Sequence, residues 1–133
     1  MKDPTKYFGT PPINLIWALK ESVKVIKEEG IENRYKRHIK DAEFIQNKLI
    51  DMGFDILAKE DCRAATLSNV VYPKNIKDAE FRSVLAEEGI VVAGGLGPYA
   101  GKLFRLGHMG NIDQHIIYST LGAIERTISK ISE

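Results

Sequence analysis

The stretch IVVAGGLGPYAGKLFRLG, residues 90–107, places two short apolar runs on either side of a loop that is rich in glycine. The runs at residues 90–93 and 103–106 predict β-strands. The glycines between them are typical of a tight, irregular connection between strands. A phosphate-binding loop is a weaker interpretation, because these glycines do not open a helix whose free amides could hold an anion.

Arg105 is the charged residue within the second of these runs. Strand alternation places Phe104 and Leu106 on one face of the strand and Leu103 and Arg105 on the other. A buried guanidinium is costly without a partner, and its planar fork fits a carboxylate through two parallel hydrogen bonds. The residues alone leave two explanations open, and they favour pairing with an internal Asp or Glu, or an exposed edge, over ligand binding.

Two helices are predicted before this unit. Thr10 can cap the first one, Pro11 and Pro12 fit its first turn, and Gly30 is a typical stop. A second helix begins at about residue 32 and ends at Gly53, because its apolar residues recur at three- and four-residue spacings. Its stripe consists of Tyr35, His38, Ile39, Ala42, Ile45, Leu49 and Met52.

The remaining elements are two strands and two helices. Residues 54–57 and 66–71 predict strands, Asn75 is a candidate cap for a third helix that stops at Gly89, and the last helix follows Asn111. We expect the stripe of this last helix to be buried; it consists of Ile117, Leu121, Ile124, Ile128 and Ile131. The element order predicts an α/β (α+β) fold with a small, mostly antiparallel sheet of about three to four strands and helices on one face.

Composition limits the classes of function. The 133 residues are 44% hydrophobic and 28% charged with a formal net charge of +1, which fits one globular domain. The sequence contains no basic run interleaved with aromatic residues, so nucleic-acid binding is not predicted. No signal peptide is evident and no apolar run approaches the roughly 18 residues of a membrane span. A single cysteine fits a reducing, cytoplasmic setting.

Neither the histidines nor the cysteine form a recognisable reactive motif. His38, His108 and His115 lack metal-ligand spacing, and His38 lies on the apolar stripe, where a satisfied, half-buried role is expected. Cys62 has no adjacent histidine or second cysteine that would favour its thiolate, so we expect an unreactive loop thiol. One cysteine also cannot ligate an iron–sulfur cluster.

Two longer motifs together carry a family resemblance. The first is YFGTPP at residues 7–12, followed by a helix and then EGIENR at residues 29–34. The second is GGLG at residues 94–97 with GKLFRLGHMG at residues 101–110. In this order and spacing they resemble the C-terminal small domain of class V aminotransferases of the alanine–glyoxylate and serine–pyruvate type, and the similarity extends over essentially the whole chain.

The resemblance implies a pyridoxal-phosphate (PLP) enzyme of fold type I that acts as a homodimer. In that family PLP lies in a large domain as a Schiff base with a lysine, and a tyrosine and a threonine of the opposite subunit contact its phosphate. Tyr7 and Thr10 stand at those positions. The arginine of the second motif binds the substrate α-carboxylate, and here it is Arg105, which reverses the preference stated from the residues alone.

The family's lysine context is not found in this sequence, and neither is the aspartate expected under the pyridine nitrogen. We therefore expect residues 1–133 to be a single C-terminal small domain, with residues 1–10 leading in from a missing large domain. Alone, it should lack the catalytic lysine, bind no PLP and have no transaminase activity.

The implied activity is transfer of an amino group between a small amino acid, alanine or serine, and a 2-oxo acid, glyoxylate or pyruvate. A free-standing small-molecule binding module is the alternative from another class. Some relatives carry the label of a soluble hydrogenase small subunit, a chemistry that one cysteine does not support.

Overall fold

The computed structural model describes residue 3 and residues 8–132, so Tyr7 lies outside the described part of the chain. Two compact units are distinguished, residues 1–35 and residues 36–133. Helix α1 (Ile13–Glu29) belongs to the first unit, and helix α2 (Ile31–Asp51) begins in the first and continues through the second. Among the described helices, none is long and apolar enough to cross a membrane.

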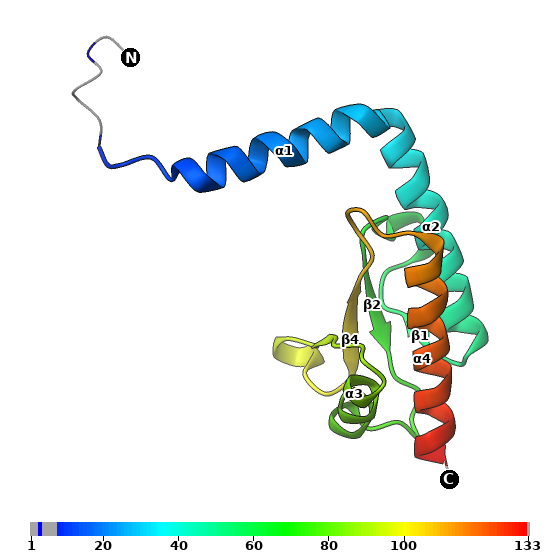
Figure 1. The fold of residues 1–133 in the computed structure, drawn as a ribbon. Coiled ribbons are helices and arrows are strands. Elements are labelled where there is room, and N and C mark those ends of the chain that lie inside the picture. Colours follow the sequence, from blue (N-terminus) through cyan, green and yellow to red (C-terminus); the bar gives the residue numbers. More distant parts are fainter. Residues whose placement is uncertain (1–2, 4–7, 133) are drawn as a thin grey trace. The chain divides into compact units, whose positions relative to one another are not determined.

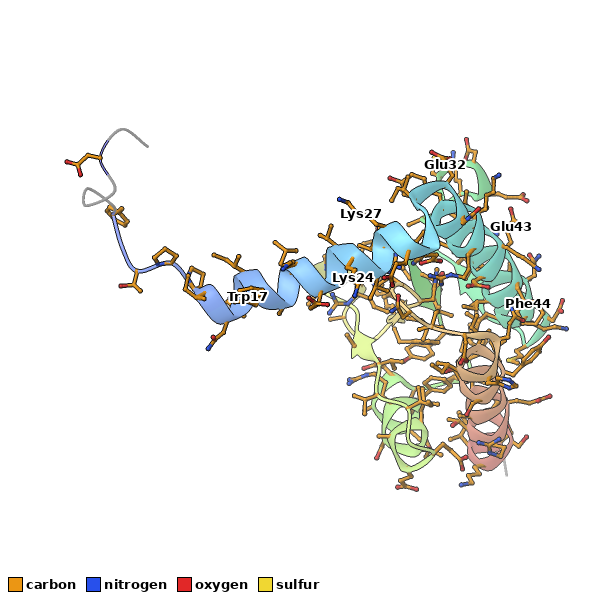
Figure 2. The ribbon with its side chains drawn as sticks, turned by 45° about the horizontal axis from the view of Figure 1, so that its top comes forward. Trp17, Lys24, Lys27, Glu32, Glu43 and Phe44 are labelled. Atoms are coloured by element: carbon orange, nitrogen blue, oxygen red, sulfur yellow. The ribbon has the colours of Figure 1, made fainter. Side chains whose placement is uncertain are left out.

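Helix α1 begins one residue after two prolines. Pro12, not Thr10, occupies the cap position and no side chain caps the helix, because the helix starts too far downstream for the Thr10 hydroxyl to serve its first amides. The helix ends where Gly30 adopts a φ of 83°, as the sequence predicts. None of its residues is buried; Trp17, Lys24 and Lys27 are labelled along it in Figure 2.

A four-stranded antiparallel sheet forms the second unit's framework. Its strands are β1 (Asp55–Ile56), β2 (Leu67–Val71), β3 (Ala93–Gly94) and β4 (Leu103–Gly107), in the spatial order β1-β2-β4-β3. The long pair at its centre is β2 and β4, visible in Figure 1. Short 3-10 turns lie at Glu60–Cys62 and Gly97–Tyr99.

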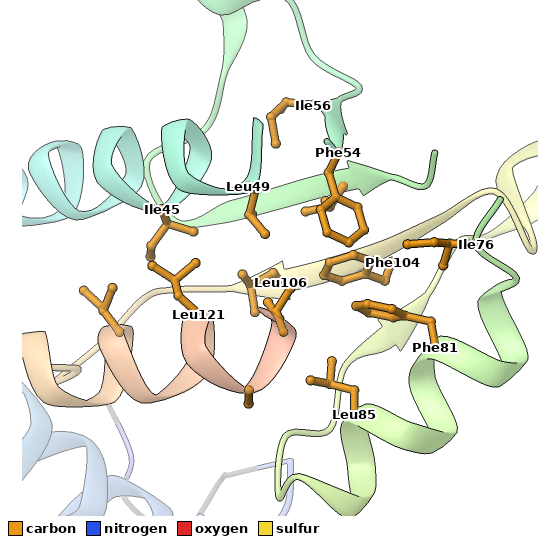
Figure 3. Close-up of a cluster of buried hydrophobic side chains, with 14 residues drawn as sticks. Ile45, Leu49, Phe54, Ile56, Ile76, Phe81, Leu85, Phe104, Leu106 and Leu121 are labelled. Atoms are coloured by element: carbon orange, nitrogen blue, oxygen red, sulfur yellow. The ribbon is translucent and has the colours of Figure 1, made fainter. Parts of the chain in front are cut away.

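Helices α2, α3 (Asp78–Glu87) and α4 (Gln114–Ser132) supply the apolar layer on one face of this sheet. Phe81 of α3 stacks on Phe104 of β4 with ring centroids 5.1 Å apart, and Phe54 meets both rings edge-on. Figure 3 shows Leu49, Leu85 and Leu121 closing the same cluster. Fully burying one such aromatic or leucine side chain contributes about 1.5–3 kcal/mol, so this cluster dominates the stability of the unit.

The α+β class with its small antiparallel sheet is confirmed, and so is the burial of Ile117, Leu121 and Ile124. Ile128 and Ile131, the end of the same stripe, are only half-buried. The expected cap of α3 is wrong: the helix starts at Asp78 behind Lys77, because Pro73 and Ile76 first close a separate turn. Strand β3 starts later than predicted. The amide of Ile90 is used to close the end of α3 on Leu85, so that residue is not free to pair in the sheet.

Candidate functional site

Arg105 lies in the middle of β4 on the face of the sheet opposite the apolar helix layer. Phe104 and Leu106 are buried among the helices, as strand alternation predicts, whereas Arg105 is half-buried. Leu103, on the same face as Arg105, is also buried. The ideal Cβ of Gly95 would lie 3.2 Å from Leu103 Cγ, so the glycine-rich loop contributes to this cover.

The guanidinium of Arg105 is held at one end and unpaired at the other. Its Nε–H donates a hydrogen bond to the Gly94 carbonyl oxygen at 2.9 Å. Within the described residues, its two Nη groups have neither a hydrogen-bond partner nor an ion-pair partner. No Asp or Glu among the described residues satisfies this side chain, and the fork that remains can donate two hydrogen bonds to a carboxylate.

A second arginine supports the same strand edge from the helix side. The Arg82 guanidinium packs against Gly94, with Cζ, Nε and Nη2 each 3.5 Å from the position a Cβ would occupy there. Arg82 grips Asp78 through two hydrogen bonds of 2.9 and 2.8 Å, and the Tyr72 hydroxyl donates to Asp78 at 3.0 Å. The peptide that anchors Arg105 is therefore backed by a hydrogen-bonded polar cluster.

The pKa shifts of Tyr72, Asp78 and Arg82 agree with these hydrogen bonds. The hydrogen bonds from Arg82 hold the pKa of the Asp78 carboxyl below its ordinary value, and Asp78 in turn raises the pKa of Arg82. Burial, followed by the contact with Asp78, raises the pKa of the Tyr72 hydroxyl. Asp78 is thus an anion, Arg82 a cation and Tyr72 a neutral donor at neutral pH.

The glycine-rich loop between β3 and β4 opens no α-helix, in agreement with the prediction that it is a connection between strands. It contains only a three-residue turn, Gly97–Tyr99, and Gly95 N–H donates to the Leu103 carbonyl at 2.9 Å. A Cβ on Gly95 would lie 2.1 Å from the Tyr99 carbonyl oxygen. Glycine at this position is therefore a packing requirement.

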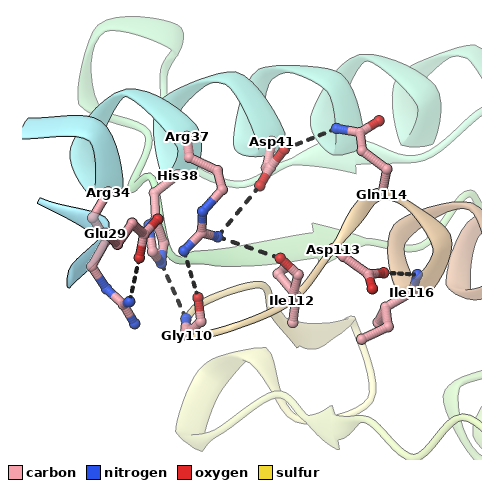
Figure 4. Close-up of polar contacts among 10 residues, drawn as sticks. All are labelled: Glu29, Arg34, Arg37, His38, Asp41, Gly110, Ile112, Asp113, Gln114 and Ile116. Carbon is pink, nitrogen blue, oxygen red and sulfur yellow. Dashed lines mark hydrogen bonds and ion pairs between the residues drawn. The ribbon is translucent and has the colours of Figure 1, made fainter. Parts of the chain in front are cut away.

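The histidines lie apart from Arg105's open face. His38 on α2 accepts a hydrogen bond from the Gly110 N–H at 3.1 Å, so its ring has a partner as expected. The side chain is buried, whereas the sequence predicted a half-buried one. Figure 4 shows this contact beside Arg37, which donates to the Gly110 and Ile112 carbonyls. Among the described residues no group of His, Cys, Asp and Glu side chains could hold a metal ion, and Cys62 is exposed.

Thr10 lies in the first unit, ahead of α1. Its side chain is exposed, and within the described chain no contact engages its hydroxyl. A free hydroxyl is a donor suited to a phosphate oxygen. Tyr7 falls outside the described residues, and Arg105 belongs to the second unit.

Asn69 is the register partner of Arg105, a polar residue that sequence reasoning missed. It faces Arg105 directly across the β2–β4 pair. Sequence alternation predicts which face of its own strand a residue occupies. It does not predict which residue lies opposite on the next strand, because that depends on strand register.

Comparison with known proteins identifies the family of the chain. A model of the family described as Aminotransferase class-V matches residues 1–105. The chain is 40% identical over 131 residues to an uncharacterized aminotransferase of Methanocaldococcus jannaschii, covering 98% of this chain and 34% of that protein. It is 32% identical to the serine–glyoxylate aminotransferase of Methylorubrum extorquens, covering 92% of this chain and 31% of that protein.

Solved structures give the same relationship. The crystal structure of an alanine–glyoxylate aminotransferase from Nostoc sp. superposes with a TM-score of 0.84 at 36% identity, covering 92% of this chain and 33% of that one. The chain thus spans about a third of the length of these relatives. Family match, sequence identity and fold agree, and the chain belongs to the class V aminotransferase family.

Proposed function

We propose that this chain is the carboxylate-binding portion of a PLP-dependent aminotransferase. The enzyme moves an amino group between a small amino acid, alanine or serine, and a 2-oxo acid, glyoxylate or pyruvate. The names of the serine–glyoxylate and alanine–glyoxylate relatives support this substrate class. PLP, when bound, supplies the electron-withdrawing ring that stabilises negative charge at the substrate's α-carbon.

The observation that carries the proposal is the state of Arg105. Its Nε is fixed to the Gly94 carbonyl while both Nη groups are unpartnered within the described residues, on the face of the sheet opposite the apolar helix layer. A guanidinium fixed at one end loses little freedom when its fork grips a carboxylate in two parallel hydrogen bonds. Its role is to fix the substrate's α-carboxylate and so orient the bond that must be broken.

Helix α1 supports a role within a larger protein. Its large apolar side chains Ile13, Leu15, Ile16, Trp17 and Leu19 are all at least half exposed, with exposed fractions of 50% or more. A contiguous apolar surface of this kind marks a contact with another protein surface. Because the chain spans about a third of its relatives, we assign this surface to the large PLP-binding domain.

Thr10 and Tyr7 are assigned to the cofactor phosphate of the opposite subunit in a homodimer. The Thr10 hydroxyl is exposed and uncommitted within the described chain, which is what such a contact needs. The catalytic lysine is assigned to the large domain.

The test compares residues 1–133 with the full-length protein. The full-length protein should exchange amino groups between alanine and glyoxylate when loaded with PLP. The 133-residue chain, mixed with PLP and reduced with borohydride, should show only scattered substoichiometric lysine labelling and no turnover. Stoichiometric labelling of one lysine together with turnover would overturn the division of labour proposed here.

A calorimetric titration of the same chain with alanine, glyoxylate and PLP addresses the alternative of a free-standing binding module. Our proposal expects no saturable heat with any of the three. Saturable binding of one ligand by the chain alone would favour the module.

A further inference from the structure

A polar groove lies between helix α2 and the segment that contains the turn Glu60–Cys62. Its volume is about 290 Å³, near the lower limit of the roughly 300–1,000 Å³ that is typical of small-molecule sites. One wall is a single face of α2, whose lining residues recur at three- and four-residue spacings, and the other wall is formed by residues 60–65. The lining includes Ala42, Glu43, Gln46, Glu60, Arg63 and Ala64. The short alanine side chains leave space that larger residues at these positions would fill.

The amide oxygen of Gln46 is an unused acceptor in this groove. The side chain is only 4% exposed, and its Nε2 donates to the Ala64 carbonyl at 3.3 Å and to Ser68 Oγ at 3.1 Å. Its Oε1 accepts no hydrogen bond within the described residues, and it is not among the sealed atoms that lack a partner, which are His108 Nδ1 and Thr127 Oγ1. Oε1 is therefore accessible from the groove that Gln46 lines. Because an unsatisfied amide oxygen in a mostly buried side chain is costly, a donor from a ligand suits this position.

Three charged side chains line the groove without ion-pair partners in the described part of the chain: Glu43, Glu60 and Arg63. Arg63 Nε donates to the Ala58 carbonyl at 3.4 Å, which leaves both Nη groups available to an acceptor. The groove thus presents two negative charges and one positive charge around the neutral oxygen of Gln46. A ligand of complementary charge carries two cationic groups and one carboxylate.

We propose that this groove binds a basic amino acid, the class that contains lysine and arginine. The ligand carboxylate pairs with the Arg63 guanidinium, which can donate two parallel hydrogen bonds to it. The α-ammonium and the side-chain cation pair with Glu43 and Glu60, and one of these cations donates a hydrogen bond to Gln46 Oε1. Each of the unused polar groups of the groove then has a partner.

The groove is separate from Arg105. Ser68, which holds the Gln46 amide, is buried on the side of the sheet that the helices cover, whereas Arg105 lies on the other face. The basic amino acid is therefore a second ligand, and the inference does not rest on the proposed function. Alanine lacks the second cationic group, so the groove should bind it too weakly to give saturable heat.

The experiment uses the full-length protein, loaded with PLP and reduced with borohydride so that the cofactor cannot react with an added amine. Saturation-transfer NMR, which detects a ligand by the magnetisation it receives from the protein, is recorded over a range of ligand concentrations. The ligands are L-lysine, cadaverine, which lacks the carboxylate, and L-norleucine, which lacks the side-chain ammonium. We expect saturable binding of L-lysine, with a Kd about threefold lower than that of either analogue, the scale of one exposed ion pair.

Variants of the lining residues place the ligand in the groove. Glu60→Gln and Arg63→Gln should each raise the Kd of L-lysine about threefold, and Arg63→Gln should not weaken cadaverine, which has no carboxylate to lose. Ala64→Leu fills the groove and should abolish saturable binding with an unchanged melting temperature, because Ala64 is exposed. The matched control is Glu125→Gln, the same change at an exposed position of α4, which should leave the Kd unchanged.

The outcomes separate this site from the substrate site. Arg105→Ala should leave the Kd of L-lysine unchanged, and a loss of binding in that variant would assign the ligand to the substrate site and overturn the proposal. No saturable binding of L-lysine, or binding that Ala64→Leu leaves intact, would also overturn it. Equal affinity for L-lysine and cadaverine would overturn the pairing of Arg63 with a carboxylate, and with it the proposed class of ligand.

Discussion

His108 Nε2 lies 2.9 Å from Ser68 Oγ, and the same hydroxyl accepts a hydrogen bond from Gln46 at 3.1 Å. The contact joins the segment after β4 to strand β2 and helix α2 through buried polar side chains. Within the described residues the other ring nitrogen, Nδ1, is buried without a partner. The imidazole is therefore buried, and burial disfavours its charged, doubly protonated form.

This site makes the stability of the fold depend on pH. Burial lowers the pKa of His108 below its ordinary value of 6.5; the backbone groups of His108 and Ala65 oppose this shift, His38 adds to it, and Asp41 opposes it. The unfolded chain therefore binds more protons than the native one in this range, and native stability falls as pH drops below about 6.5 toward the lower native pKa. At higher pH the full stability is present.

The measurement is the free energy of unfolding from urea titrations between pH 7.5 and 5. As the pH is lowered, we expect this free energy to fall more steeply for the natural chain than for His108→Gln. The window lies above the range in which Asp78 and Glu88 titrate, since their carboxyl pKa values are lowered from 3.8 and 4.5. His115→Gln, an exposed histidine on α4, is the matched control and should keep the natural slope. Equal slopes for the natural chain and His108→Gln would contradict this prediction.

Thr127 on α4 is fully buried, and within the described chain its hydroxyl has no hydrogen-bond partner. Replacing an unsatisfied buried hydroxyl by a methyl group of the same shape removes a desolvation penalty. We expect Thr127→Val to raise the free energy of unfolding by about 1 kcal/mol. Thr120→Val is the control, because Thr120 donates to the Ile116 carbonyl at 2.8 Å and gains nothing from losing its hydroxyl. A lower melting temperature for Thr127→Val would refute this account.

Gly95 allows the close approach of the loop that covers Leu103. An alanine Cβ there would lie 2.1 Å from the Tyr99 carbonyl oxygen and 2.8 Å from its carbon, and backbone atoms cannot step aside as a side chain can. We expect Gly95→Ala to cost about 1–3 kcal/mol of stability, the usual scale for overpacking. Gly107→Ala has nothing within 4 Å of the new carbon and should be nearly neutral in the same thermal melts. Similar melting temperatures for both variants would show that the loop adapts without cost.

Sequence periodicity was sufficient for the elements that bury a continuous stripe. The spacing of Ile117, Leu121 and Ile124 predicts α4 and its buried face, and alternation predicts the face of Arg105. Local signals failed where a tertiary contact decided the outcome. Helix α3 starts at Asp78, whose carboxylate is held by Tyr72 and Arg82, and not behind the expected cap Asn75.

The candidate site was only half predictable for the same reason. Arg105 stands out in its strand as a charge among apolar residues, and motif resemblance gave it a role. Asn69 and Arg82 become neighbours of the site only through the order β1-β2-β4-β3 and the packing of α3 on β3. Strand register and helix docking are long-range properties, which a pattern within one segment does not contain.

Arg105→Ala is the most direct test of the proposed function. In the full-length protein we expect it to weaken engagement of the substrate carboxylate by roughly 2–5 kcal/mol, the scale for truncating one partner of a buried charge pair. The measurement is kcat/KM for both half-reactions, with alanine and with glyoxylate. Arg105→Lys should recover only part of the loss, because an ammonium keeps the charge but not the two-pronged geometry.

The fold should tolerate both substitutions, and this separates a binding role from a structural one. Phe104 and Leu106 supply the packing of β4 on its other face, and the hydrogen bond to Gly94 that the alanine removes contributes about 1 kcal/mol. A melting temperature within a few degrees of the natural protein is therefore expected for Arg105→Ala. A collapsed melt would assign Arg105 to the structure of the sheet, whereas a normal melt with normal kcat/KM would remove it from the substrate site.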